Sequence, residues 1–149
     1  MTGYEEAVKP VEILVVEDNH ADVRLIFEVF KDFKLRNNIS RAKDGAEALL
    51  FLRKKDDFSR SPRPDIIILD LNLPRINGFE ILKEIKSDEG LRNIPVVVLS
   101  TSDSEKDIET AYSLQANCFV TKPAGLDDFI MVIKSIEHFW LNTAKLPVN

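Results

Sequence analysis

The stretch Asp65-Ile66-Ile67-Ile68-Leu69-Asp70-Leu71-Asn72-Leu73-Pro74 decides the fold of this chain, because four apolar residues run without a break into a carboxylate. Such a short apolar run, rich in β-branched residues, predicts a strand buried on both faces, as in a parallel sheet that helices cover. Asp70 then follows the carboxyl end of the strand, where open α/β sheets bind their ligands. The stretch therefore predicts a central strand and a functional position directly after it.

Apolar strand segments alternate with amphipathic helix segments along the chain. Besides the central one, strands are expected at residues 11–17, 39–42, 94–99 and 118–121. A helix is expected after each strand, because capping residues precede apolar side chains at helical spacing. These helices fall at about 20–33, 45–55, 78–86, 105–115 and 126–142. Strict alternation and right-handed crossovers predict an α/β fold, a doubly wound five-stranded parallel sheet in the flavodoxin-like order 2-1-3-4-5 with helices on both faces.

Length and composition restrict the class of protein. The 149 residues fit one domain, which we expect at residues 11–142, between a flexible arm at 1–10 and a C-terminal tail at 143–149. The net charge of −5, with acidic and basic residues interspersed, argues against nucleic acid as a partner. No apolar run approaches the roughly 20 residues needed to cross a membrane. Cys118 is the only cysteine, which fits a reducing compartment, so we expect a cytoplasmic protein.

The predicted strand order brings polar residues from several strand ends to one edge of the sheet. They are Glu17, Asp18, Asp70, Ser100 and Lys122. Clustered carboxylates repel one another and therefore need a cation. A site with only oxygen ligands suits Mg²⁺, with Mn²⁺ as the alternative. We expect Asp18 and Asp70 to be direct ligands and Glu17 to bind directly or through water. The backbone carbonyl of Asn72 is expected to be a further ligand.

The same residues suggest phosphoryl transfer. One oxygen of Asp70 would bind the metal and the other would be free to attack a phosphorus atom, as carboxylates do when they form aspartyl phosphates. Lys122 and the metal would offset the charge of the transferred group, and Ser100 would donate a hydrogen bond to one of its oxygens. Taken singly, such residues could be helix caps or solvated surface groups. Their convergence through one topology favours the functional interpretation.

Several motifs resemble those of the receiver domain of two-component response regulators, including the chemotaxis-regulator type. They are Val16-Glu17-Asp18-Asn19, Leu69-Asp70-Leu71-Asn72-Leu73-Pro74, Asn77-Gly78, Ser100-Thr101 and Lys122-Pro123, and the resemblance covers about residues 11–142. In that family Asp70 matches the phosphorylated aspartate, and Glu17 and Asp18 match the metal-binding pair. The resemblance implies a switch that accepts a phosphoryl group from a sensor histidine kinase and alters partner binding. Such a switch takes part in its own phosphotransfer and dephosphorylation but is not otherwise an enzyme.

The resemblance also implies roles around the phosphoacceptor. Ser100 matches the switch hydroxyl and Phe119 the aromatic switch position. Lys122 matches the family's lysine, which a cis proline usually follows. Asn72 and Ser102 match the residues that flank the path of the attacking water and so tune dephosphorylation. Both side chains are small and uncharged, so we expect phosphoryl decay that is not exceptionally slow.

Within the family, the chain is most similar to the cyanobacterial phytochrome response regulators. The shared features are the loop 56–64, the run 95–102 and the C-terminal residues Phe139-Trp140-Leu141 with Leu146-Pro147. The similarity implies a phytochrome-type kinase. Two departures leave other histidine kinases open, because that group often has serine after the lysine and a more polar start to the third helix than Asn77-Gly78-Phe79. The segment beyond residue 142 is too short for an output domain, so we expect a stand-alone receiver.

The final helix predicts both a buried face and a partner surface. Phe129, Ile133, Ile136 and Trp140 form a stripe that the sheet should bury. Other apolar residues widen the apolar arc, and scattered exposed groups of this kind are normal. The alternative, which the family supports, is a homodimer through the final helix and tail. Its contacts would come from Val132, Phe139, Leu141 and Leu146-Pro147.

Two other functions share parts of this pattern. A flavodoxin-like cofactor-binding protein has the same architecture, but it needs a phosphate-cradling loop after the first strand. This chain has Glu17-Asp18-Asn19-His20 there, whose negative charges would repel a phosphate. An Asp-dependent phosphatase would carry its Asp-x-Asp pair on the first strand, whereas Asp70-Leu71-Asn72 follows the third. Bound flavin absorbance and turnover of a generic phosphate ester would distinguish these alternatives.

Overall fold

The computed structural model describes residues 9–148, which form a five-stranded parallel sheet in the order β2-β1-β3-β4-β5. The strands are β1 (Val11–Val16), β2 (Asn37–Ala42), β3 (Ile66–Leu69), β4 (Val96–Ser100) and β5 (Cys118–Thr121). The helices are α1 (His20–Lys31), α2 (Gly45–Arg53), α3 (Gly78–Ser87), α4 (Glu105–Ser113) and α5 (Leu126–Glu137). Two short segments add a 3₁₀ turn, η1 (Asp56–Phe58), and a π-helical turn, η2 (His138–Thr143). The predicted fold and strand order are confirmed. The predicted arm lies largely outside the described residues.

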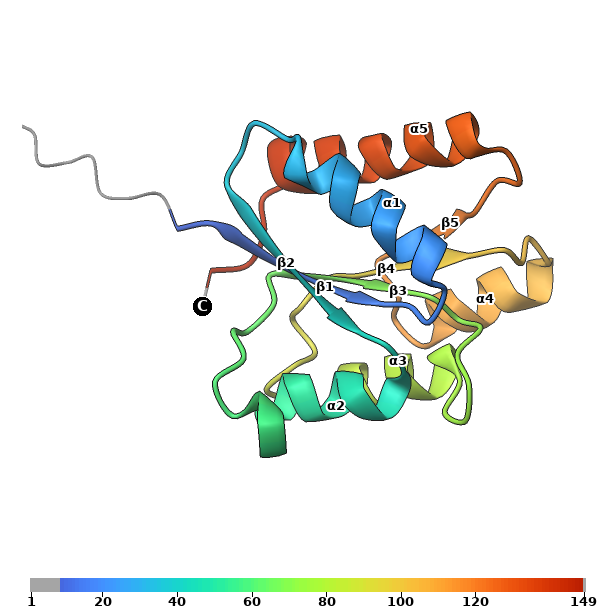
Figure 1. The fold of residues 1–149 in the computed structure, drawn as a ribbon. Helices are drawn as coiled ribbons and strands as arrows, with labels where there is room; N and C mark the ends of the chain where they lie inside the picture. Colours follow the sequence, from blue (N-terminus) through green and yellow to red (C-terminus); the bar gives the residue numbers. More distant parts are fainter. Residues whose placement is uncertain (1–8, 149) are drawn as a thin grey trace, which may run out of the picture.

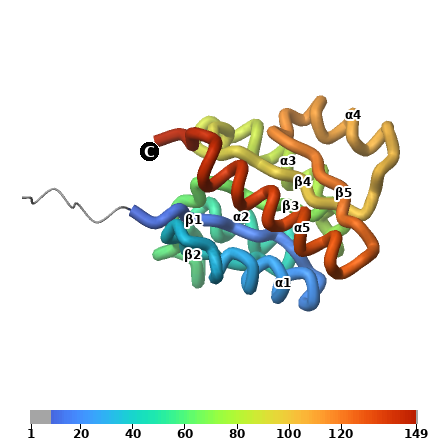
Figure 2. Tube along the Cα trace, turned by 90° about the horizontal axis from the view of Figure 1, so that it is seen from above, coloured from blue at the N-terminus to red at the C-terminus, as the bar shows by residue number. Residues whose placement is uncertain are grey.

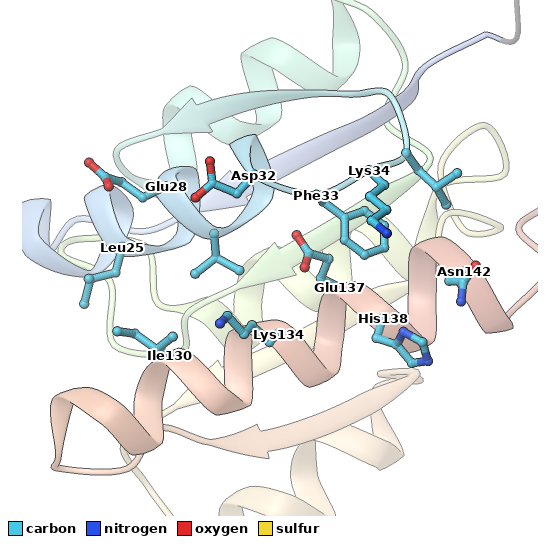
Figure 3. A pocket seen from close by; sticks show the side chains of 12 residues that line it. Leu25, Glu28, Asp32, Phe33, Lys34, Ile130, Lys134, Glu137, His138 and Asn142 are labelled. Carbon is cyan, nitrogen blue, oxygen red and sulfur yellow. The ribbon is translucent and has the colours of Figure 1, made fainter.

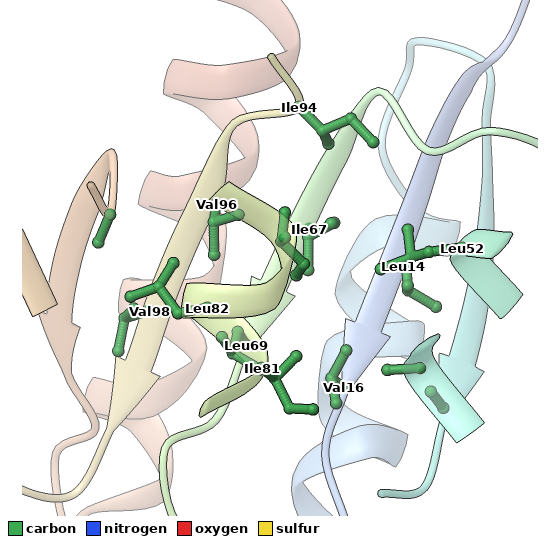
Figure 4. Close-up of a cluster of buried hydrophobic side chains, with 14 of the residues drawn as sticks. Leu14, Val16, Leu52, Ile67, Leu69, Ile81, Leu82, Ile94, Val96 and Val98 are labelled. Carbon is green, nitrogen blue, oxygen red and sulfur yellow. The ribbon is translucent and has the colours of Figure 1, made fainter. Parts of the chain in front are cut away.

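The helices form two layers, with α1 and α5 on one face of the sheet and α2, α3 and α4 on the other (Figure 1). Seen from above, α1 and α5 run over the strands (Figure 2). Alternate strand residues enter two different cores, because successive side chains point to opposite faces. Ile66 and Ile68 pack under α1 and α5, whereas Ile67 and Leu69 pack against α2 and α3 (Figure 4). This double burial explains the unbroken apolar run in the central strand.

Several element boundaries differ from the sequence prediction, most of them by one or two residues, and β2 and α2 show the causes most clearly. Strand β2 begins at Asn37 rather than Ile39, since Asn37 and Asn38 pair with the start of β1. The side-chain amide of Asn38 also donates to Glu12 Oε1 at 2.8 Å. Helix α2 ends at Arg53 rather than near Lys55, because Lys54 adopts a left-handed conformation with φ of 54°. The amide of Lys54 caps this helix end. Polar edge residues and one left-handed residue thus set boundaries that apolar periodicity does not mark.

The C-terminal end of the last helix corrects one prediction. Leu141 was expected on a partner surface, but it is 8% exposed and belongs to the core under α1 and α5. The reason is the π-helical turn, in which residues five apart lie on the same face, so Leu141 follows Ile136 into the core. The predicted stripe is confirmed, with Phe129, Ile133 and Ile136 buried and Trp140 packed against them.

Two further findings concern the described chain as a whole. Every peptide bond among residues 9–148 is trans, including the bond before Pro123, where the family resemblance implied a cis proline. The trans form is the lower-energy isomer even before proline. Within the same residues, every helix is too short or too polar to cross a membrane.

Candidate functional site

The carboxyl ends of β1 and β3 place two acidic side chains next to each other. Val16 pairs with Leu69 in the parallel register, so the residues that follow them, Glu17 and Asp70, are neighbours. The Asp70 amide donates to the Val16 carbonyl at 3.0 Å, which extends the strand pairing into the site. Glu17 and Asp70 are buried, with 2% and 5% of their surface exposed, whereas Asp18 is exposed. One carboxylate oxygen from each of the three lies within 4.8 Å of the others.

Lys122 supplies the positive charge of this cluster. Its backbone amide donates to the Ser100 carbonyl at 2.6 Å, which fixes the end of β5 beside β4. Its ammonium group forms an ion pair with Glu17 and lies 2.9 Å from Asp22 Oδ2 and 3.6 Å from Asp70 Oδ2. Only 7% of the Lys122 side chain is exposed, so it is not a solvated surface lysine. We call Glu17, Asp18, Asp22, Asp70 and Lys122 the carboxylate site.

The charges of the carboxylate site shift the pKa values of its members. The pKa of Glu17 is raised to about 8, chiefly because burial disfavours the charged form; Asp70 also raises it, and Lys122 partly offsets the rise. Burial alone would lower the pKa of Lys122, but Glu17 and Asp22 raise it above its usual value. Lys122 therefore stays protonated at neutral pH, and one ammonium faces several carboxyl groups. This excess of negative charge favours a second cation.

The oxygen donors of the carboxylate site suit a hard divalent cation. Glu17, Asp18 and Asp70 together offer carboxylate oxygens at a spacing that one ion can bridge. The Asn72 amide donates to Asp70 Oδ1 at 3.1 Å, while Asp70 Oδ2 faces Lys122. The Asn72 side chain is exposed and donates to Thr101 Oγ1 at 3.1 Å. The geometry thus fits divalent-metal binding next to a carboxylate whose two oxygens have different surroundings.

Gly78 allows the first turn of α3 to approach the Asp70 backbone. A Cβ atom at this position would lie 2.5 Å from the Asp70 carbonyl oxygen and 2.5 Å from the Leu71 Cα atom. The Gly78 amide donates to the Leu71 carbonyl at 3.0 Å. Asn77 caps the helix by accepting from the Glu80 amide at 3.1 Å. The Asn77-Gly78 pair of the sequence therefore fixes the loop that carries Asp70.

The predicted switch residues lie on β4 and β5. Ser100 is fully buried, and its Oγ accepts a hydrogen bond from the Ser102 amide at 3.1 Å. Phe119 is half-buried, pairs in register with Val98, and packs against the core on the α2–α4 face. The Ser102 hydroxyl donates to Asp107 Oδ2 at 2.6 Å. Within residues 9–148, the Ser100 hydroxyl is thus engaged by its own loop and not by Asp70.

Two residues that contact the site were missed in the sequence. Asp22 was interpreted only as part of the helix start, and its place beside Lys122 depends on contact between residues 100 positions apart. Arg41 on β2 donates to the Glu17 carbonyl at 3.1 Å and the Asp18 carbonyl at 3.2 Å. A third Arg41 contact, at 3.2 Å, reaches His20 Nδ1. Arg41 therefore holds the loop that carries the acidic pair, and only the β1–β2 register reveals it.

The geometry agrees with comparisons to known proteins. The family described as "Response regulator receiver domain" matches residues 13–134. Response regulator Rcp1 from Synechocystis sp. is 44% identical over 96% of this chain and 97% of its own length. The probable methanogenesis regulatory protein FilR2 from Methanothrix harundinacea is 40% identical over 95% of this chain and 91% of its own length.

Solved structures give the same result. The Mn²⁺-bound form of Rcp1 has a TM-score of 0.91 and 45% identity over 93% of this chain and 100% of that chain. The phosphorylated cyanobacterial phytochrome response regulator RcpA has a TM-score of 0.91 and 47% identity over 94% of this chain and 100% of that chain. This chain is therefore similar to both proteins in sequence and in fold over more than nine tenths of its length.

Proposed function

Because the chain belongs to the response regulator receiver family, we propose that Asp70 is its phosphoacceptor and that a histidine kinase supplies the phosphoryl group. Members of this family are signalling switches and not conventional enzymes. The observation that carries the assignment is the position of Asp70. It is a buried carboxylate at the end of the central strand, next to Glu17 and Asp18 and 3.6 Å from the Lys122 ammonium.

In the proposed reaction, an Asp70 carboxylate oxygen forms a bond to phosphorus while the bond from phosphorus to the kinase's histidine nitrogen breaks. The imidazole leaves with the electron pair. A bound Mg²⁺ would be held by Glu17, Asp18, Asp70 and the Asn72 carbonyl, and it would neutralise charge on the phosphoryl oxygens. Mn²⁺ is the alternative ion, and the Mn²⁺-bound form of Rcp1 supports it. Lys122 would orient the incoming group and stabilise its negative charge.

The switch and the decay rate belong to the same proposal. Ser100 would exchange its bond from the Ser102 amide for a bond to the phosphoryl group, and Phe119 would occupy the space that it vacates. Asn72 and Ser102 would flank the path of the water that hydrolyses the acyl phosphate. Asn72 donates to Thr101 and Ser102 to Asp107. Because both side chains are small and uncharged, we expect water to reach the phosphoryl group.

Treatment with phosphoramidate and Mg²⁺, followed by intact-mass measurement, tests the phosphoacceptor. The wild type should gain the mass of one phosphoryl group, and Asp70→Asn should gain none. Asp103→Asn is the matched control, since Asp103 is exposed in the loop after β4 and should leave labelling unchanged. Labelling of Asp70→Asn to the wild-type level would refute the assignment.

We also propose a phytochrome-type kinase as the phosphodonor, which the similarity to RcpA supports. FilR2, at 40% identity, is named as a probable methanogenesis regulatory protein and not as a phytochrome response regulator. Sequence similarity therefore does not identify the kinase, which has to be identified by phosphotransfer. The single cysteine fits a reducing cytoplasm, where we place this exchange. Transfer from a phosphorylated phytochrome kinase should be faster than from an unrelated histidine kinase, and equal rates would contradict the pairing.

A dimer is the second part of the partner proposal. Met131 and Phe139 are 62% and 50% exposed on α5 and η2, and with Val132 and Trp140 they line a hollow of about 280 Å³ beside β5. Leu146 and Pro147 instead line a cavity with Val11 of the same chain, so we centre the contact on Met131 and Phe139. A twofold axis would pair this surface with itself.

Sedimentation tests the dimer. Phe139→Ser should lower the fraction of dimer, because an aromatic anchor can carry much of the energy of an interface. Leu35→Ser is the control, since Leu35 is 42% exposed but lines the groove between α1 and η2 and not this hollow. A monomer mass for the wild type, both with and without phosphorylation, would refute the dimer and leave the phosphoacceptor proposal intact.

A further inference from the structure

A groove separates the C-terminal half of α1 and its following loop from α5 and η2. Its volume is about 830 Å³, within the range of sites that bind small molecules. Its apolar lining includes Leu25, Val29, Phe33 and Ile130, which come from both sides (Figure 3). None of these residues belongs to the carboxylate site. We call this feature the α1–α5 groove.

Glu137 gives the groove a buried, unpaired acceptor. The residue is 5% exposed, and its Oε2 atom has no hydrogen-bond partner among the described residues. Figure 3 shows the carboxylate rising from α5 toward the end of α1, beside Phe33. A buried acceptor without a donor is unfavourable, and the large majority of such atoms in folded proteins are paired. The groove therefore holds a polar atom that a ligand with an N–H group would satisfy.

The charges around Glu137 indicate the sign of that ligand. Glu28 and Asp32 face the groove from α1, Lys34 from the loop that follows, and Lys134 and His138 from the Glu137 side. No described ion pair joins Glu137 to Lys134, although the two are one helical turn apart. Burial raises the pKa of Glu137 to about 7, with Lys134 lowering it and Asp32 raising it. A further cation, in addition to Lys134, would stabilise the ionised form of Glu137, which burial and the charge of Asp32 both disfavour.

We propose that the α1–α5 groove binds a small amphipathic organic cation, whose ammonium group donates to Glu137 Oε2 and whose hydrocarbon part packs on Val29 and Phe33. The orphaned oxygen requires a donor, the Glu137 carboxylate with Glu28 and Asp32 on the facing helix favours a positive one, and the apolar walls require a hydrocarbon body. The acceptor is almost fully enclosed, so a narrow terminal group fits it better than a flat macromolecular surface. This site is independent of the phosphoacceptor proposal.

Titration with phenethylamine, followed by amide NMR, tests the proposal, with phenethyl alcohol as the neutral probe of the same skeleton. At about pH 8 the amine is protonated and Glu137 is mostly ionised. We expect saturable shifts of the Ile130, Glu137 and Phe33 amides with a dissociation constant in about the millimolar range. The alcohol should bind at least about tenfold more weakly.

Two variants and one control locate the binding. Glu137→Gln keeps the size of the side chain and should remove the preference for the amine over the alcohol. Val29→Trp should fill the groove and abolish both responses, and Asp70→Asn should bind the amine as the wild type does. The absence of saturable shifts, equal binding of the two probes, or unchanged amine preference in Glu137→Gln would overturn the proposal. Groove signals that shift on dilution of the protein alone would assign the groove to a second copy and overturn it too.

Discussion

Glu17 and Glu137 are buried to a similar extent, with 2% and 5% of their surface exposed, and burial raises the pKa of Glu17 to about 8 and that of Glu137 to about 7. Their surroundings differ. Glu17 follows a strand, pairs with Lys122, and lies beside Asp18 and Asp70. Glu137 ends a helix, and its Oε2 atom has no partner among the described residues. Burial of an acid is therefore common to both regions, and the paired cation and convergent oxygens distinguish the carboxylate site.

The strongest test of this comparison removes a lysine from each region. Lys122→Met would leave Glu17, Asp22 and Asp70 facing one another without a cation. Loss of one partner from a buried ion pair costs about 3 kcal/mol of the free energy of unfolding. Lys134→Met is the matched change beside Glu137, where no ion pair is lost, and should cost less than about 1 kcal/mol. Urea unfolding at neutral pH measures both, and similar losses would contradict the distinction.

The second test uses the pH dependence of stability. The pKa of Glu137 is about 7 in the folded state, above its ordinary value of 4.5, so the folded state binds the proton more tightly. Its contribution to stability is complete below pH 4.5 and is lost as the pH rises through 7. Relative to Glu137→Gln, the wild type should therefore lose on the order of 3 kcal/mol over this range, at about 1.4 kcal/mol per pKa unit. Glu17 titrates in both proteins and cancels in the difference. Parallel stability curves would show that Glu137 has an ordinary pKa.

The third and smallest effect concerns the support of the carboxylate site. Arg41→Met removes the donors to the Glu17 and Asp18 carbonyls, and we expect about tenfold weaker Mn²⁺ binding, the low end for partners of metal ligands. Arg53→Met is the control, because Arg53 pairs with exposed Glu84 far from these carbonyls. Electron paramagnetic resonance of free Mn²⁺ gives the affinities. Equal affinity in Arg41→Met and Arg53→Met would remove Arg41 from the account.

The two regions were unequally predictable from the sequence. Apolar runs that end in carboxylates, together with the rule for strand ends, predicted the sheet order and placed Glu17, Asp18 and Asp70 at one edge. Neither Asp22 nor Arg41 was predicted as part of the site. Asp22 on α1 meets Lys122 from 100 residues away, and Arg41 reaches backbone carbonyls across the β1–β2 pair. The burial of Glu137 had a signal, since Glu137 follows Ile133 by four residues on the apolar face. Leu141 had none, because the π-helical turn that buries it changes the helical period.

The central claim is that Asp70 accepts the phosphoryl group, and the most direct measurement locates the modified residue. Protein treated with phosphoramidate and Mg²⁺ can be reduced with borohydride, which converts an aspartyl phosphate to homoserine, and then sequenced by tandem mass spectrometry. The tryptic peptide that contains the central strand holds both Asp65 and Asp70, so the comparison is internal. We predict homoserine at position 70 only. Homoserine at position 65, 18 or 22 with an unmodified Asp70 would contradict the account.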